Sequence, residues 1–130
     1  MKSDITNEED IKILVDSFYK KVIVDPAIGF VFTEIVALSW EKHIPIMYAF
    51  WGSILLGAKE YNGNPMQQHI SMDKAVHFEQ HHFDRWLTLW EETVREHFEG
   101  TIAEEAIVRA KNIGALMLHK IQKSRVGNTF

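Results

Sequence analysis

The sequence predicts a single all-α domain, and three observations support this prediction. Apolar residues recur at helical spacing through most of the 130 residues. Capping and stop signals separate these stretches, and none of them shows the strict alternation of a half-buried strand. With 46% hydrophobic and 25% charged residues, the chain can build one core and is not disordered. We expect one domain over residues 1–130, with polar, frayed ends at 1–6 and 124–130.

The first helix is expected directly after Thr6, which forms a capping-box pattern with Glu9. The pair Asp25-Pro26 ends this helix, because proline lacks an N–H and restricts the residue before it. Its apolar face follows the i, i+3, i+4, i+7 spacing with Ile11, Leu14, Val15, Phe18 and Val22.

A second helix is expected from the candidate cap Ser39 to Gly57. Pro45 lies inside this stretch, so we expect either a kink there or a helix that begins near His43. The next stretch, residues 58–65, has the clearest loop composition of the chain.

Shorter pieces surround these elements. A short apolar piece near Phe30 precedes the second helix, one helical turn is expected over residues 66–69, and residues 70–76 have no clean period. The longest apolar periodicity then begins near His77 and stops at Gly100. Its face consists of Phe78, Phe83, Trp86, Leu87, Trp90, Val94 and Phe98.

The last helix is expected to begin at a second capping-box pattern, Thr101 with Glu104. Its apolar positions are Ile102, Ala106, Ala110, Ile113, Met117 and Ile121. A polar tail follows from Ser124.

Charge and composition exclude several functions. The net charge of −4 argues against nucleic acid as a partner, and the absence of cysteine excludes disulfides and thiolate chemistry. The acidic N-terminus is not a signal peptide, and no apolar run approaches a membrane span of about 20 residues. We expect a soluble, cytoplasmic monomer. No phosphate loop or nucleophile motif indicates hydrolase or transferase chemistry.

The histidines are the candidate ligands of a metal or cofactor. His77 and His81 have a chelating i, i+4 spacing, but their place in the first turns of an amphipathic helix favours a solvated helix start. His69 differs from them, because the irregular segments on both sides can aim it inward. His43 lies one helical turn before Met47 and shares its apolar face if that segment is helical. On these residues alone, the aromatic and Met positions favour core packing over a cofactor site.

Several fragments occur in order between positions 18 and 113, and together they resemble the third group of truncated haemoglobins. The absence of a Gly-Gly pair also fits that group. The fragments are Phe18-Tyr19 with Val22, Trp40-Glu41-Lys42-His43, Phe50-Trp51-Gly52 with Leu55-Leu56-Gly57, Tyr61-Asn62-Gly63-Asn64-Pro65 leading to His69, His82-Phe83-Asp84-Arg85-Trp86-Leu87, and Arg109-Ala110-Lys111-Asn112-Ile113.

The resemblance implies a two-over-two helical sandwich around b-type haem, with His69 as the proximal iron ligand. It places Tyr19, His43 and Trp86 on the distal side, where they would face a bound ligand. Phe32 would pack on the haem face. The other haem contacts that it implies are Met47, Phe50 and Trp51 on the distal helix and Met66, Phe78, Phe83 and Trp90 as wall residues.

Two departures from the family pattern affect this site. The family often has a Leu-Pro pair after the proximal histidine, whereas this chain has Ile70-Ser71-Met72-Asp73-Lys74, so the proximal loop is expected to differ. Pro45, two residues after His43, would turn that histidine either outward as a gate or inward as a sixth iron ligand.

The expected function is therefore the binding of dioxygen, nitric oxide, carbon monoxide or similar ligands. Three candidate donors, Tyr19, Trp86 and His43, predict tight oxygen retention, which suits redox chemistry or detoxification of nitric oxide or peroxide. One alternative is a haem peroxidase or nitric-oxide dioxygenase with an external reductase, since 130 residues leave no room for a reductase domain. The other is a haem-free helical interaction or His-rich metal-binding module, in which His77, His81 and His82 would matter and His69 would not.

Overall fold

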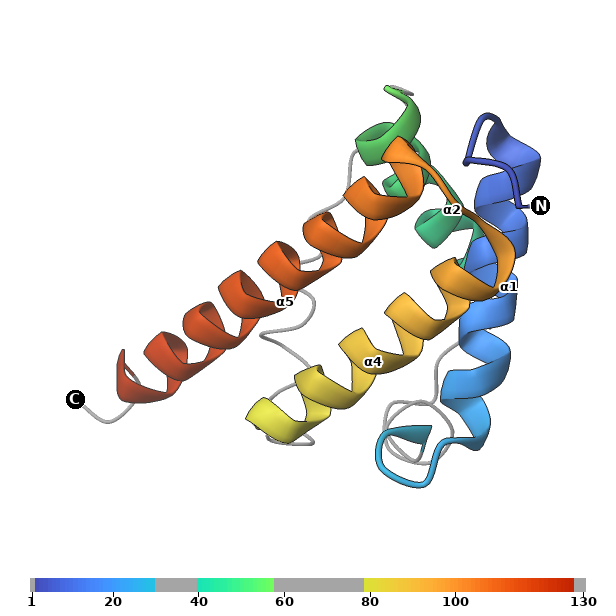
Figure 1. Ribbon diagram of the computed structural model, residues 1–130. Helices are drawn as coiled ribbons and strands as arrows, with labels where there is room; N and C mark the ends of the chain where they lie inside the picture. Colours follow the sequence, from blue (N-terminus) through green and yellow to red (C-terminus); the bar gives the residue numbers. More distant parts are fainter. Residues whose placement is uncertain (1, 30–39, 58–78, 128–130) are drawn as a thin grey trace.

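The structure of the chain is a computed structural model. It describes residues 2–29, 40–57 and 79–127, without the side chains of 40–43, 122 and 124–127. This part of the chain contains four helices and no strand, which confirms the all-α prediction (Figure 1). The helices are α1 (Glu8–Val24), α2 (Trp40–Leu56), α4 (Gln80–His97) and α5 (Thr101–Gly127).

The helices form two packed pairs. Helices α4 and α5 run antiparallel and are joined by a tight corner, and α1 and α2 form the other pair (Figure 1). The pairs meet mainly where α1 packs against α4, and α2 also touches α5. This is the expected two-over-two arrangement, and its core lies between the pairs.

Local signals explain both ends of α1. Asn7 is the N-cap, and its side chain accepts a 3.0 Å hydrogen bond from the Asp10 N–H, while Thr6 donates back to the Asp10 carboxylate. The cap therefore lies one residue later than the predicted Thr6. The helix ends at Val24, before Asp25 and Pro26, as predicted. All five predicted apolar positions are buried, namely Ile11, Leu14, Val15, Phe18 and Val22.

The limits of α2 agree with the predicted stretch from Ser39 to Gly57, whereas α4 ends earlier than predicted. Helix α2 begins at Trp40 and includes Pro45, so the alternative of a helix that begins near His43 is wrong. Helix α4 begins at Gln80 after the N-cap Glu79, and it ends at His97 before the predicted stop at Gly100. The predicted start near His77, and the predictions for residues 58–76 and for Phe30, lie outside the described residues.

The predicted fraying of the N-terminus is wrong for residues 2–6. Ile5 is only 1% exposed, and the Glu99 N–H donates to the Ser3 carbonyl oxygen at 3.0 Å. Asp4 accepts hydrogen bonds from the first turn of α5, so this segment is held against the start of the last helix. Burial of one large apolar side chain and these hydrogen bonds offset the entropy of ordering the segment.

The start and end of α5 also correct the sequence prediction. Thr101 is the first helical residue rather than its cap, and Glu104 donates its N–H to the Gly100 carbonyl oxygen. The capping acceptor is the distant Asp4. At the other end, the backbone stays helical to Gly127, beyond the predicted end at Ser124.

Candidate functional site: an aromatic cluster between the helix pairs

Phe18 lies at the centre of a group of aromatic rings contributed by α1, α2 and α4. Its ring centroid is 5.0 Å from Tyr19, 5.1 Å from Trp90 and 6.0 Å from Trp86, each time in an edge-to-face geometry. Trp51 of α2 stacks on Trp90 at 4.3 Å and 22°. These five residues, which we call the aromatic cluster, connect three helices through side chains.

Tyr19 is the buried hydroxyl group of this cluster. Its side chain is 8% exposed, and burial raises the pKa of its phenol well above the usual value near 10. The hydroxyl group therefore stays protonated and keeps its capacity to donate a hydrogen bond at any physiological pH.

The two tryptophans of α4 differ although they lie one helical turn apart. Trp90 is 1% exposed, and its indole Nε1–H donates to the Ala106 carbonyl oxygen of α5 at 3.1 Å. Trp86 is only partly buried, and no described residue accepts a hydrogen bond from its indole N–H. The indole N–H of Trp90 thus joins α4 to α5, whereas that of Trp86 donates to no acceptor among the described residues.

A hydrogen bond between side chains joins α2 to α1 beside the aromatic cluster. The Tyr48 hydroxyl donates to Asp16 of α1 at 2.5 Å. Burial, followed by the bond to Asp16, raises the pKa of Tyr48 to about 12. The ring centroid of Phe50, also on α2, lies 5.3 Å from that of Trp51. Met47 of the same helix is partly buried against this core.

The structure brings together some of the residues that the resemblance implied for the site. Tyr19, Trp51, Trp86 and Trp90 belong to the aromatic cluster, Met47 and Phe50 border it, and Phe83 is buried. The predicted His69, Phe32, Met66 and Phe78, the departure at residues 70–74 and the side chain of His43 lie outside the described residues.

The sequence did not reveal the central place of Phe18, which was predicted as a core residue and named in the fragment Phe18-Tyr19 but not as a site residue. Its position next to Tyr19 was the available signal. Sequence reasoning also treated Asp25 only as a helix stop, although its carboxylate pairs with Arg85, the residue before Trp86. No short-range pattern signals this second contact, since the two residues are 60 positions apart.

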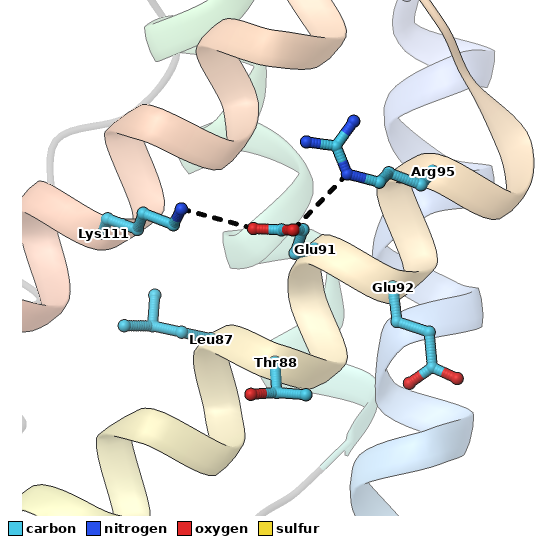
Figure 2. Close-up of a pocket in the computed structure, with 6 residues that line it drawn as sticks. All are labelled: Leu87, Thr88, Glu91, Glu92, Arg95 and Lys111. Atoms are coloured by element: carbon cyan, nitrogen blue, oxygen red, sulfur yellow. Dashed lines mark hydrogen bonds and ion pairs between the residues drawn. The ribbon is translucent and has the colours of Figure 1, made fainter.

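A separate surface pocket of about 360 Å³ lies along α4 and α5 (Figure 2). Glu91 lies between the side chains of Lys111, at 3.3 Å, and Arg95, at 3.4 Å. The hydrogen bond from Lys111, more than any other contact, lowers the pKa of Glu91. The charges at its centre are paired with one another, and none of the predicted haem contacts lines it. Its lining consists of Leu87, Thr88, Glu91, Glu92, Arg95 and Lys111.

The described residues offer little support for a metal site of histidines and carboxylates. They contain no group of three or more such side chains able to hold a metal ion. The rings of His81 and His82 lie 4.1 Å apart, but His82 uses Nδ1 to accept the Glu79 N–H at 2.9 Å. In the same part of the chain, none of the helices has the length and apolar character needed to cross a membrane.

Comparisons with known proteins assign the family. The family model described as bacterial-like globin matches residues 3–119. The chain is 30% identical over 126 residues to the group 3 truncated hemoglobin ctb of Campylobacter jejuni, which covers 95% of this chain and 97% of that protein. The crystal structure of group III truncated hemoglobin from Campylobacter jejuni aligns with a TM-score of 0.81 at 30% identity, over 93% of this chain and 95% of that one.

These matches confirm the resemblance inferred from the sequence fragments, and they confirm the truncated-globin fold. They also support the haem-binding interpretation over the haem-free helical module. The chain belongs to the bacterial-like globin family, whose members hold haem and bind small gaseous ligands such as oxygen.

Proposed function

We propose that this globin holds b-type haem through His69 and retains dioxygen tightly. The observation that carries the proposal is the pair of donors at the aromatic cluster. The buried Tyr19 hydroxyl stays protonated, and the Trp86 indole N–H has no acceptor among the described residues. The two side chains come from different helices and approach the same ring, that of Phe18.

The chemistry of this region fits a flat, mostly apolar cofactor. The described part of the cluster consists of aromatic rings, with Met47 and Phe50 beside it and no carboxylate among its members. Such walls exclude water and lower the local dielectric constant, which strengthens every remaining hydrogen bond. When bound, haem would supply an iron with one position open to a diatomic ligand. Phe32, Met66, Phe78, Phe83 and His43 complete the proposed contacts.

Tyr19 and Trp86 would act as hydrogen-bond donors to a small, partly negative ligand. A hydrogen bond of this kind in a dry pocket is worth about 1.4 kcal/mol, which corresponds to roughly tenfold slower ligand loss. Two such donors, or three with His43, slow release further. Slow release suits redox chemistry, or the removal of nitric oxide or peroxide, better than oxygen delivery. Catalytic turnover as a peroxidase or nitric-oxide dioxygenase would draw its electrons from a separate reductase. A cytoplasmic location and a monomeric state stay predictions.

Absorption spectra of haemin-supplied protein test the cofactor and its ligand. The oxidised, reduced and carbon monoxide-treated parent should give histidine-ligated spectra. His69→Gly should lose them and regain them with added imidazole. His97→Gly is the matched control, because His97 is an exposed histidine at the last residue of α4. Parent-like spectra in His69→Gly, or the same loss in His97→Gly, would refute His69 as the ligand. No specific haem uptake by the parent would refute the whole proposal.

A further inference from the structure

The Asp25 carboxylate is buried where α1 ends and α4 begins. Its side chain is 2% exposed, and Oδ1 accepts hydrogen bonds from Nε and Nη2 of Arg85, both at 2.7 Å. Oδ2 accepts the backbone N–H groups of Ala27 at 3.0 Å and Ile28 at 3.1 Å. Both carboxylate oxygens are thus in use, one within the turn after α1 and one toward α4.

This ion pair joins the two helices that carry the proposed ligand donors. Tyr19 lies on α1, six residues before Asp25, and Trp86 directly follows Arg85 on α4. Adjacent residues of an α-helix point about 100° apart around its axis. When Arg85 is held against the end of α1, the direction of the Trp86 side chain is therefore held as well.

The pair differs from the other ionic contact between the same helices. Lys21 of α1 reaches Glu96 at 2.5 Å and Glu92 at 3.7 Å, but both carboxylates are exposed. Exposed ion pairs contribute little because water and salt screen them. Around Asp25, burial raises the pKa, but Arg85 and the two backbone N–H groups outweigh it and lower the pKa of the carboxyl group. The carboxylate is therefore charged and held in place.

We propose that Asp25 and Arg85 are positioning residues of the ligand pocket, and that they set the separation between the Tyr19 hydroxyl and the Trp86 indole N–H. Neither residue touches the ligand. They act by fixing the rotation of α4 against α1, with the Phe18 ring packed edge-on against both donors' side chains. This inference rests on the proposed function for its effect on ligand release, but not for its effect on Trp86.

Arg85→Met and Asp25→Asn remove the pair in complementary ways. Asn retains an oxygen for the N–H groups of Ala27 and Ile28 and presents no negative charge to Arg85. Each single variant leaves one partner of the ion pair without the other, which could unfold the protein. The double variant removes both charges and therefore tests the loss of the pair without this penalty. Arg85→Lys restores one cationic donor. Lys21→Met is the matched control, because it removes the exposed α1–α4 ion pair.

Two measurements report the position of Trp86. The first is the indole ¹H–¹⁵N spectrum of the full chain, in which four tryptophans give signals and Trp86→Phe identifies the relevant one. The second is the C–O stretching frequency of carbon monoxide in the haem-loaded protein, which responds to nearby donors. We expect Arg85→Met and Asp25→Asn to shift both the Trp86 indole signal and the C–O stretching frequency. Oxygen dissociation should become about three- to tenfold faster. Arg85→Lys should return part of each change.

The results separate this inference from the proposed function. If Arg85→Met, Asp25→Asn and the double variant move the Trp86 signal no further than Lys21→Met does, the positioning role is refuted. If the parent takes up no haem but the Trp86 signal moves in these variants, the positioning role stands and the proposed function fails. If haem binds and Trp86→Phe accelerates oxygen release but the ion-pair variants do not, the inference alone fails.

Discussion

The Asp4 carboxylate accepts a 2.8 Å hydrogen bond from the backbone N–H of Ala103, 99 residues further along the chain. It accepts a second bond, of 2.9 Å, from Ile102. Helix α5 is thus capped by a residue from the opposite end of the sequence. Helix capping is ordinarily a local interaction, and here it is also a tertiary contact that holds the N-terminal segment in place.

Asp4→Ala should lower the free energy of unfolding by about 1 kcal/mol at neutral pH, as loss of an N-cap does. Burial raises the pKa of Asp4, but the N–H groups of Ile102, Ala103 and Ile5 outweigh it and lower the pKa. A carboxyl group of this kind stabilises the fold above its unfolded pKa of about 3.9 and loses that effect as the pH falls through the folded value. Urea unfolding near pH 7 and pH 3 should show the difference shrinking in acid.

Thr101→Ala is the matched control for this prediction, since Thr101 belongs to the local capping-box pattern but is not the cap. It should change the free energy of unfolding by less than about 0.5 kcal/mol. If Thr101→Ala costs as much as Asp4→Ala, the distant cap does not stabilise α5.

Gly100→Ala should destabilise the protein by about 1–3 kcal/mol. Gly100 has a φ of +143°, and an added Cβ would lie 2.5 Å from Cγ of Asp4. Gly57→Ala is a comparison, because Gly57 also has a positive φ of +73°, but no atom of the described residues lies within 4 Å of an added Cβ. It should cost only the backbone strain of about 1 kcal/mol. Thermal unfolding of both variants measures the difference, and equal losses would argue against the Asp4 contact.

Trp90→Phe and Trp86→Phe should have opposite phenotypes. Trp90→Phe removes the buried hydrogen bond to Ala106 and part of the ring stack with Trp51, so we expect a loss of about 1–3 kcal/mol in unfolding free energy. Trp86→Phe should leave stability nearly unchanged and raise the oxygen dissociation rate about tenfold. Denaturant unfolding and stopped-flow ligand displacement distinguish them. Unchanged oxygen release in Trp86→Phe would remove this residue from the ligand site.

His82→Gln should make stability less sensitive to acid. His82 accepts the Glu79 N–H at Nδ1, so its ring is neutral in the fold. Burial, followed by the neighbouring His81, lowers the pKa of His82 against the opposite effect of Glu79. The cap therefore stabilises α4 above the unfolded pKa of about 6.5 and weakens as the pH falls through the folded value.

Glutamine has an acceptor that does not titrate. Between about pH 7 and pH 5, the free energy of unfolding of the parent should therefore fall by several tenths of a kcal/mol more than that of His82→Gln. Urea unfolding across this range tests the expectation. His97→Gln serves as the control, since His97 is an exposed histidine on the same helix. Identical pH profiles for the parent and His82→Gln would show that the cap does not depend on this histidine.

The helices were predictable where their signals are local. The apolar period of α1 and the Asp25-Pro26 stop depend on neighbours in the sequence, and the structure agrees with both. The start of α5 was not predictable in this way. Thr101 and Glu104 form the usual capping pattern, but the N–H groups of Ile102 and Ala103 donate to Asp4 and that of Glu104 donates to the Gly100 carbonyl oxygen. A local pattern cannot report an acceptor that lies so far away in sequence.

In the candidate site, too, the sequence predicted individual residues but not the contacts that depend on the tertiary fold. The fragment resemblance singled out Tyr19 and Trp86, and both lie against Phe18 in the structure. Periodicity cannot tell Trp86 from Trp90, because both lie on one helical face. They differ in burial and in whether the indole N–H donates to a carbonyl of α5, and both depend on the tertiary fold. The Asp25–Arg85 contact could not be predicted for a related reason. In the sequence, Asp25 is only the residue at a helix stop, Arg85 is a charged residue within a different predicted helix, and 60 positions separate them.

The docking of the N-terminal segment has a consequence for the order of events during protein synthesis. Ser3 and Asp4 are synthesised 96–99 residues before their hydrogen-bond partners, which lie at positions 99–103. At about 5–20 residues per second, the ribosome needs roughly 5–20 s to reach those partners. During this time, Ser3 and Asp4 lack the backbone partners that they have in the folded protein. The contact between the N-terminal segment and the start of α5 can therefore form only after α1, α2 and α4 have been synthesised.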